Sequence, residues 1–223
     1  RTVPVANNYY VRPTSYQWLD PTGMTTVSLS DEAASSAQTI PFDFVYYGQT
    51  NTACYIGSNG LLGFNTAGFL YTPHHKIPYA PTPNSALYPH WADLDPGAGG
   101  NVYVGTTGAA PDRIEVISWV NVPHFDTNAI TYTFQALLKE TTHDIIFQYQ
   151  NVQATLAPYS TGNAATVGIE NSDGTVARQY TYNGTAPVTN GQAILFTHTP
   201  PAPTLTGPAS PSTNLTIELT GTT

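Results

Sequence analysis

The segment Ile114-Glu115-Val116-Ile117-Ser118-Trp119-Val120 decides the fold class of this chain. It is short and rich in β-branched and aromatic side chains, which is typical of a half-buried β-strand. Two segments of the same kind follow at residues 132–138 and 144–149. Closely spaced strands with no helical pattern between them predict an antiparallel sheet.

The same pattern continues in both directions along the chain. Further strands are expected at residues 25–29, 42–47, 102–104, 166–170, 178–182 and 193–196. The turn dipeptides are Asn59-Gly60, Asp173-Gly174, Asn183-Gly184 and Asn190-Gly191, and both residue types tolerate a positive φ. One short helical turn is expected at residues 31–37. The chain is therefore predicted to be all-β, with residues 1–199 forming an antiparallel β-sandwich of jelly-roll type.

Composition limits the classes of function. Of 223 residues, 14 are acidic and 6 are Lys or Arg, which gives a net charge of −8. This balance argues against nucleic-acid binding and against a polybasic membrane surface. No apolar run is long enough for a membrane span. The neutral polar surface favours an extracellular or cell-surface protein, released after removal of a signal peptide. Cys54 is the only cysteine, so we expect a buried apolar residue and no internal disulfide.

The C-terminal part has a different composition. Residues 200–212 are rich in proline and are predicted to form a stiff, extended linker. In residues 213–223, Leu215, Ile217 and Leu219 alternate with polar residues, which is typical of a single strand. A strand carried on a linker is what strand donation to a neighbouring copy requires. The alternatives are that the strand folds back on its own domain, or that it begins a further domain. The N-terminal segment 1–11 is a second candidate donor.

Asp93 and Asp95 form a candidate calcium site. They share one face of an extended segment, and a glycine-rich turn at residues 96–100 follows them. Carboxylate and carbonyl oxygens are the ligands that calcium prefers. The alternative is that these carboxylates cap the turn at Pro96-Gly97. No other cofactor is expected.

Aromatic residues form a candidate ligand platform. The residues concerned are Tyr9, Tyr10, Trp18, Tyr71 and Tyr79. Their rings would stack on the apolar faces of a polysaccharide, and the alternative is that they pack within the sandwich. No nucleophile elbow is found in the sequence, so we expect no enzymatic activity.

Several stretches resemble one family in their order along the chain. They include residues 16–20, 40–48, 57–64, 86–95, 119–122, 133–138 and 146–149, among them Tyr88-Pro89-His90-Trp91-Ala92-Asp93. Over about residues 9–196, the chain resembles the nidogen-like extracellular β domain of secreted bacterial proteins. This resemblance implies a β-sandwich used outside the cell for adhesion or assembly. It implies no shared enzymatic activity.

These observations predict a non-enzymatic extracellular structural subunit. It would self-assemble head-to-tail as a homopolymer, a pilus-like surface filament, by β-strand donation through residues 213–220. The alternative is an adhesion module of a larger secreted protein that recognises polysaccharide or a host or matrix surface.

Overall fold

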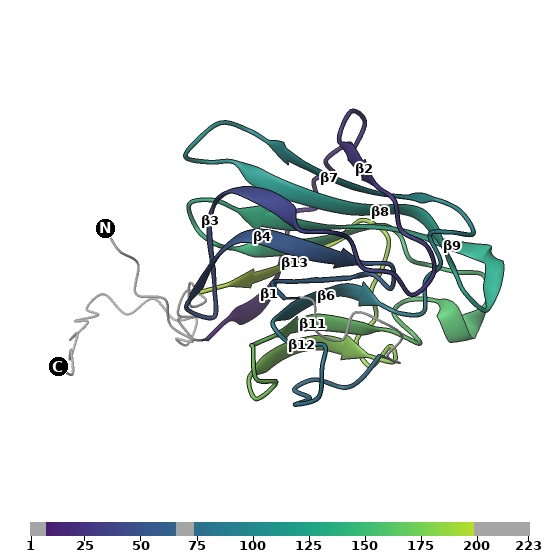
Figure 1. Ribbon diagram of the computed structural model, residues 1–223. Helices are drawn as coiled ribbons and strands as arrows, with labels where there is room; N and C mark the ends of the chain where they lie inside the picture. The colour runs from purple at the N-terminus through teal and green to yellow at the C-terminus, as the bar shows by residue number, and fades with distance from the viewer. Residues whose placement is uncertain (1–7, 66–73, 199–223) are drawn as a thin grey trace, which may run out of the picture.

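A computed structural model of the chain describes residues 8–65 and 74–198 (Figure 1). The described residues form thirteen strands and one short 3-10 helix. The strands are β1 (Tyr10–Thr14), β2 (Thr25–Val27), β3 (Gln38–Tyr46), β4 (Gln49–Gly57), β5 (Leu61–Gly63), β6 (Ala86–Trp91), β7 (Asn101–Thr107), β8 (Ile114–His124), β9 (Thr127–Lys139), β10 (Ile145–Asn151), β11 (Thr166–Glu170), β12 (Ala177–Tyr182) and β13 (Gln192–Thr197). The helix is η1 (Ala157–Tyr159). The Pro-rich linker at 200–212, the strand at 213–223 and Tyr71 lie outside the described residues.

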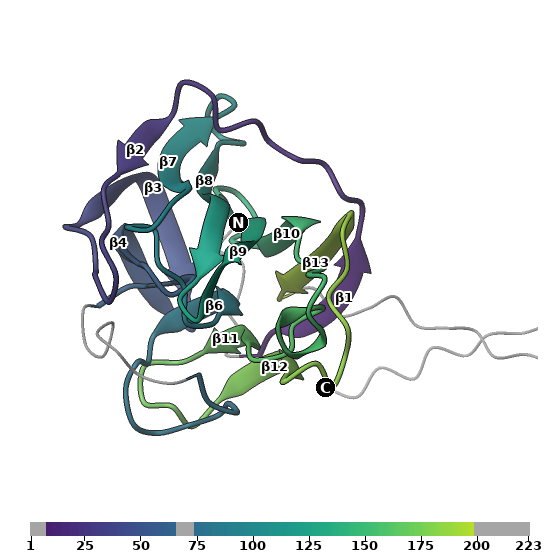
Figure 2. The same ribbon diagram turned by 90° about the vertical axis from the view of Figure 1, so that its right-hand side faces the viewer.

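The strands form two antiparallel sheets. The seven-stranded sheet has the order β1-β13-β10-β9-β8-β7-β2, and the six-stranded sheet has the order β12-β11-β6-β5-β4-β3. The two sheets pack face to face (Figure 2). The prediction of an all-β antiparallel sandwich is confirmed, and its jelly-roll connectivity remains a prediction.

Polar tips of buried aromatic side chains connect the two sheets. Trp119 of β8 stacks on Phe134 of β9 with ring centroids 5.1 Å apart. Its indole N–H donates to the Gly57 carbonyl of β4, in the other sheet, at 3.1 Å. The Tyr149 hydroxyl of β10 likewise donates to the Pro89 carbonyl of β6 at 2.8 Å. Large rings thus fill the interior while their N–H and O–H groups stay paired.

The helical turn expected at residues 31–37 does not form. This segment contains a turn and pairs with the second half of β4 instead. The Ser35 N–H donates to the Ile56 carbonyl at 2.8 Å, and the Ser58 N–H donates to the Ala33 carbonyl at 2.8 Å. Pairing with a strand therefore overrides the weak local helix propensity.

The turn glycines and the cysteine behave as expected. Gly60, Gly174, Gly184 and Gly191 have φ angles of 70°, 66°, 70° and 75°. Cys54 is buried and free, and burial raises the pKa of its thiol to about 12. It is therefore an apolar core residue.

Three of the four edge strands carry features that hinder pairing between whole sheets. The edges of the seven-stranded sheet are β1, which contains Pro13, and β2, which has only three residues. At one edge of the six-stranded sheet, β3 carries Pro41 and Asp43. Short strands, prolines and charges at an edge disfavour edge-to-edge association.

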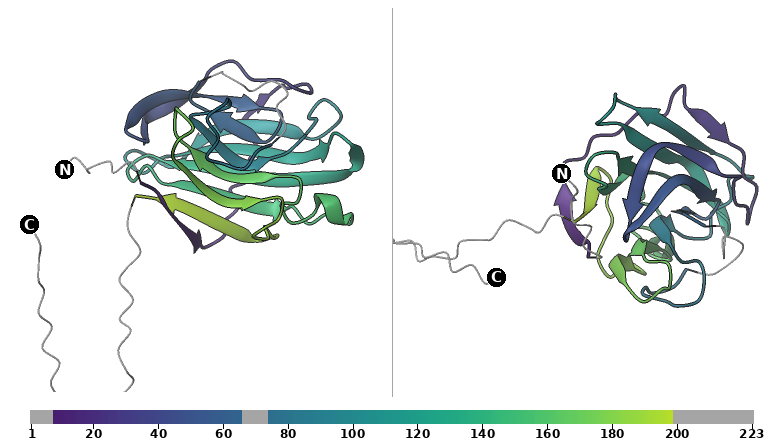
Figure 3. Two further views of the ribbon diagram at one scale, coloured as in Figure 1. Left: turned by 90° about the horizontal axis from the view of Figure 1, so that it is seen from below. Right: turned by 60° about the vertical axis from the view of Figure 1, so that its left-hand side comes forward.

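The described chain begins and ends at the same end of the sandwich (Figures 1 and 3). Strand β1 pairs with β13, with Tyr10 opposite Thr197. Nδ1 of His198 lies 3.3 Å from the carbonyl oxygen of Asn8. Residues 199–223 therefore follow a folded domain from a point beside its entry.

Candidate functional site

An extended segment, which we call the strap (residues 15–24), crosses the outer face of the seven-stranded sheet. Figure 2 shows it running from β1 to β2, which lie at opposite edges of that sheet. The side-chain amide of Gln148 accepts a hydrogen bond from the Gln17 N–H at 2.6 Å and donates to the Gln17 carbonyl at 2.7 Å. Gln135 makes the same pair of bonds with Leu19. Both glutamines are buried, so the strap is fixed to the sheet on either side of Trp18.

A surface groove of about 570 Å³ lies between the strap and the sheet. It is lined by Trp18, Asp20, Pro21, Thr22, Gly23, Tyr103, Val120 and Gln150. Val120 and Gln150 both sit where the pairing with β9 is interrupted, at irregularities between Trp119 and Val122 and between Tyr149 and Asn151. Such bulges redirect side chains, and here they flank β9 from either side.

The groove combines aromatic surface with polar groups. Trp18 and Tyr103 are half-buried, and within the described residues neither the indole N–H nor the Tyr103 hydroxyl has a hydrogen-bond partner. Asp20 Oδ1 accepts bonds from the Thr22 N–H at 2.9 Å and the Thr22 hydroxyl at 2.7 Å. These bonds lower the pKa of Asp20, so the carboxylate is charged at neutral pH. The lining residues include no Lys, Arg or His, so the groove offers no positive charge to an anionic ligand.

The other predicted ligand aromatics do not join Trp18 in this groove. The structure corrects the prediction for Tyr9, which is 1% exposed and so cannot present its ring to a ligand. The ring packs against Tyr47 and His198 at centroid distances of 5.0 and 4.0 Å. Tyr9 directly precedes β1, and its side chain points into the core of the sandwich. Tyr10 and Tyr79 are 39% and 37% exposed, but they lie on β1 and in the segment before β6.

A second candidate site gathers three carboxylates. One carboxylate oxygen each from Asp31, Glu32 and Asp93 lies within 4.8 Å of the others. Asp31 and Glu32 belong to the turn that pairs with β4, and Asp93 follows β6. Oδ1 of Asp31 and Oδ1 of Asp93 are buried without a hydrogen-bond partner among the described residues. Burial raises the pKa values of both Asp31 and Asp93, and nearby carboxylates add to it, Asp95 for Asp31 and chiefly Asp126 for Asp93.

This oxygen set has the chemistry that calcium takes as ligands, but it differs from the predicted pair. Asp95 Oδ1 accepts a bond from the Gly97 N–H at 2.8 Å, which is the turn-capping arrangement. Asp93 is accompanied instead by Asp31 and Glu32, which sequence reasoning missed because they are distant along the chain. No local sequence pattern predicts that these three carboxylates lie close together.

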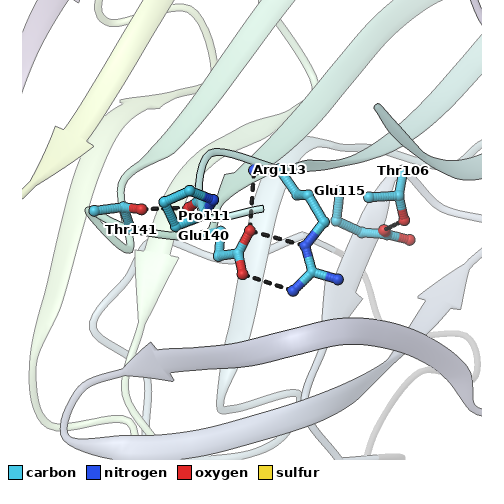
Figure 4. A network of polar contacts seen from close by, with 6 residues as sticks. All are labelled: Thr106, Pro111, Arg113, Glu115, Glu140 and Thr141. Atoms are coloured by element: carbon cyan, nitrogen blue, oxygen red, sulfur yellow. Dashed lines mark hydrogen bonds and ion pairs between the residues drawn. The ribbon is translucent and has the colours of Figure 1, made fainter. Parts of the chain in front are cut away.

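A third polar network lies at the ends of β8 and β9 and is structural in character (Figure 4). The Arg113 guanidinium forms two parallel bonds with the Glu140 carboxylate, at 2.8 Å and 2.6 Å. Glu115 of β8, two residues after Arg113, is 2% exposed and accepts a bond from the Thr106 hydroxyl at 2.5 Å. Burial raises the pKa of Glu115 to about 7.

The fold defines an antiparallel β-sandwich domain with a surface groove on the outer face of its seven-stranded sheet. The chain belongs to the NIDO-related family, whose model, described as NIDO related, matches residues 8–214. The expected resemblance is thereby confirmed, and the match extends beyond residue 196 into the proline-rich part. Domains of the NIDO type are associated with extracellular proteins. No curated protein and no solved structure matches the chain. Among the described residues, no helix has the length and apolar character needed to cross a membrane.

Proposed function

We propose that this protein is a non-enzymatic extracellular structural subunit that self-assembles head-to-tail into a filament. Residues 213–220 would link each subunit to the next, with Leu215, Ile217 and Leu219 as the buried side chains. One observation carries the proposal: the described chain ends at His198 beside its own entry point, at one end of a sandwich whose two sheets are already packed together. The tail therefore starts at one end of the sandwich, from which it can extend to a neighbouring copy.

The edges of the sandwich support the assignment of the link to the tail. Pro13 in β1 and Pro41 and Asp43 in β3 hinder the pairing of whole sheets. A single strand with three aliphatic side chains can bury apolar surface worth about 5–8 kcal/mol before the cost of ordering it. Because donor and acceptor surfaces differ, the contact repeats as an open filament.

The test compares the full chain with a variant that ends at Pro200, by light scattering after size exclusion and by negative-stain microscopy. We expect filaments from the full chain and monomers from the shortened one. A triple substitution of Leu215, Ile217 and Leu219 by Ser should also give monomers. The matched control, Thr216→Ala with Thr220→Ala, changes the other face of the same strand and should still polymerise.

Two outcomes would contradict this mechanism. Filaments from the chain ending at Pro200 would move the link to the N-terminal segment or to a face of the sandwich. Monomers from every variant, the full chain included, would favour the adhesion module.

The second candidate function is polysaccharide binding, and the groove at Trp18 is the observation that favours it. Two half-buried aromatic side chains beside Asp20 and Gln150 offer the mixture of apolar surface and polar groups that small-molecule sites use. A glycan array probed with the full chain and with Trp18→Ala tests this function. Binding lost in the variant would support it.

A further inference from the structure

We propose that the groove lined by Trp18 and Tyr103 binds the proline-rich residues 200–211 of a second copy of this chain. The inference rests on the proposed function, because it names the surface at which one subunit receives the tail of the next. The groove and the sequence of the segment match in aromatic and proline content, in hydrogen-bonding groups and in charge.

The segment repeats one pattern twice. Pro200-Pro201-Ala202-Pro203 and Pro208-Ala209-Ser210-Pro211 each place proline at their first and fourth positions. A polyproline II helix has three residues per turn, so both prolines of each pattern fall on the same side. Segments of this type are recognised by grooves lined with aromatic side chains.

The hydrogen-bonding groups of the groove suit such a ligand. A polyproline II backbone makes no internal hydrogen bonds, so its carbonyl groups need outside donors. The Trp18 indole N–H and the Tyr103 hydroxyl are donors without a partner among the described residues. Asp20 and Gln150 can in turn accept bonds from the hydroxyls that the segment carries between its prolines.

The charge of the segment also fits. Residues 199–212 contain no charged side chain, and the groove contains a carboxylate and no base. A neutral segment with hydroxyl donors meets no repulsion there, whereas an anionic chain would.

The direction of β13 favours a second copy over the same chain. Gln192 lies opposite Tyr149, next to the groove residue Gln150, and Phe196 lies opposite Ile145. The chain therefore moves away from the groove along β13, by about 17 Å between the levels of Ile145 and Gln150. Its own first proline pattern follows His198 almost at once and would have to reverse direction. The groove of the next subunit imposes no such reversal.

Trp18 itself supplies the readout for a test on the full chain. Trp91 and Trp119 are 3% and 0% exposed, so a neutral quencher such as acrylamide reports mainly on the half-buried Trp18. We expect quenching to decrease as protein concentration rises and neighbours dock. A synthetic peptide of residues 199–212 should protect Trp18 in dilute protein and should shorten filaments.

The variants separate the groove from the rest of the surface. Tyr103→Ala should weaken peptide binding, measured as protection of Trp18, by about tenfold or more, as expected for an aromatic anchor. Tyr79→Ala, an exposed aromatic outside this groove, is the matched control and should bind as before. Replacing Pro200, Pro203, Pro208 and Pro211 by Ala in the full chain should leave Trp18 open to quencher at every concentration.

Each outcome has one meaning. Filaments in which Trp18 stays fully quenchable would overturn this inference and leave the proposed function standing. Peptide protection without filaments would support the groove and overturn the filament function. Protection that does not depend on protein concentration would place the segment in its own chain and overturn the intermolecular contact. Protection by a neutral polysaccharide and not by the peptide would make the groove a sugar site.

Discussion

The side-chain amide of Gln148 bonds to both backbone polar groups of Gln17, accepting from the N–H at 2.6 Å and donating to the carbonyl at 2.7 Å. One side chain thus replaces the neighbouring strand that the strap lacks on this face of the sheet. The same pairing of Gln135 with Leu19 secures the strap on the other side of Trp18. The groove therefore depends on two glutamines that do not line it.

Removing this amide should loosen the strap. Gln148→Ala leaves the Gln17 N–H and carbonyl without their partner, and we expect the free energy of unfolding to fall by about 1–3 kcal/mol for the two bonds. Urea denaturation gives this value, and quenching of Trp18 should rise in the folded state. Gln49→Ala, at an exposed position of β4, is the control, with an expected change within about 0.5 kcal/mol. Equal stability of the two variants would show that the amide pairing contributes nothing.

Glu115 should make stability depend on pH near neutrality. Its carboxyl is buried, and burial raises its pKa to about 7. Between about pH 4.5 and 7 the folded protein keeps a proton that the unfolded chain releases. The free energy of unfolding should therefore fall with rising pH, by up to about 3 kcal/mol.

Glu115→Gln isolates this effect because an amide can still accept the bond from Thr106. We expect the variant to be more stable than the native protein at pH 8 and to lack the decline between pH 5 and 8 in urea denaturation. Asp112→Asn, at an exposed position, should keep the decline. An unchanged slope in Glu115→Gln would assign the decline to other carboxyls.

His90 should act in the opposite direction in acid. It is fully buried against Tyr132 and Phe134, with ring centroids 4.6 and 5.3 Å away, and neither ring nitrogen has a hydrogen-bond partner among the described residues. Burial lowers its pKa to about 3. Below about pH 6.5 His90 is protonated in the unfolded chain and remains neutral in the folded protein. The free energy of unfolding therefore falls as the pH falls.

His90→Phe removes both the titration and the unpaired nitrogens. We expect it to be more stable than the native protein at pH 4, with a smaller difference at pH 7, in thermal unfolding monitored by circular dichroism. His75→Phe, at a half-buried position, is the control. A variant that loses stability equally at both pH values would indicate that the larger ring does not fit the site.

The acidic cluster predicts a response to calcium. Adding about 1 mM Ca²⁺, a concentration at which extracellular calcium modules bind, should raise the melting temperature relative to protein in chelator. Asp93→Asn should abolish this rise, and without calcium it should be more stable than the native protein because one of three crowded carboxylates is gone. Asp112→Asn should respond as the native protein does. An unchanged melting temperature of the native protein on adding Ca²⁺ would show that the cluster does not bind calcium.

Local sequence patterns predicted many of the strands, including β11, which is buried at every position, and missed others. Residues 114–120 and 132–138 lie within β8 and β9, as expected. Strand β6 is buried at every position and contains Pro89 and His90, so it has no alternation to detect. The turn at 31–37 was mistaken for a helix because its hydrogen-bond partners lie in β4, beyond any local window.

By itself, the sequence determined the all-β class, the turns at glycine and the apolar character of Cys54, because each depends on neighbours along the chain. It also selected Trp18 and Asp93. Only the tertiary structure decided their surroundings. The strap brings Trp18 to Tyr103 and Gln150, and the turn against β4 brings Asp31 and Glu32 to Asp93. Strand order and bulges determine these meetings, and they involve contacts between residues far apart in the chain that no local periodicity records.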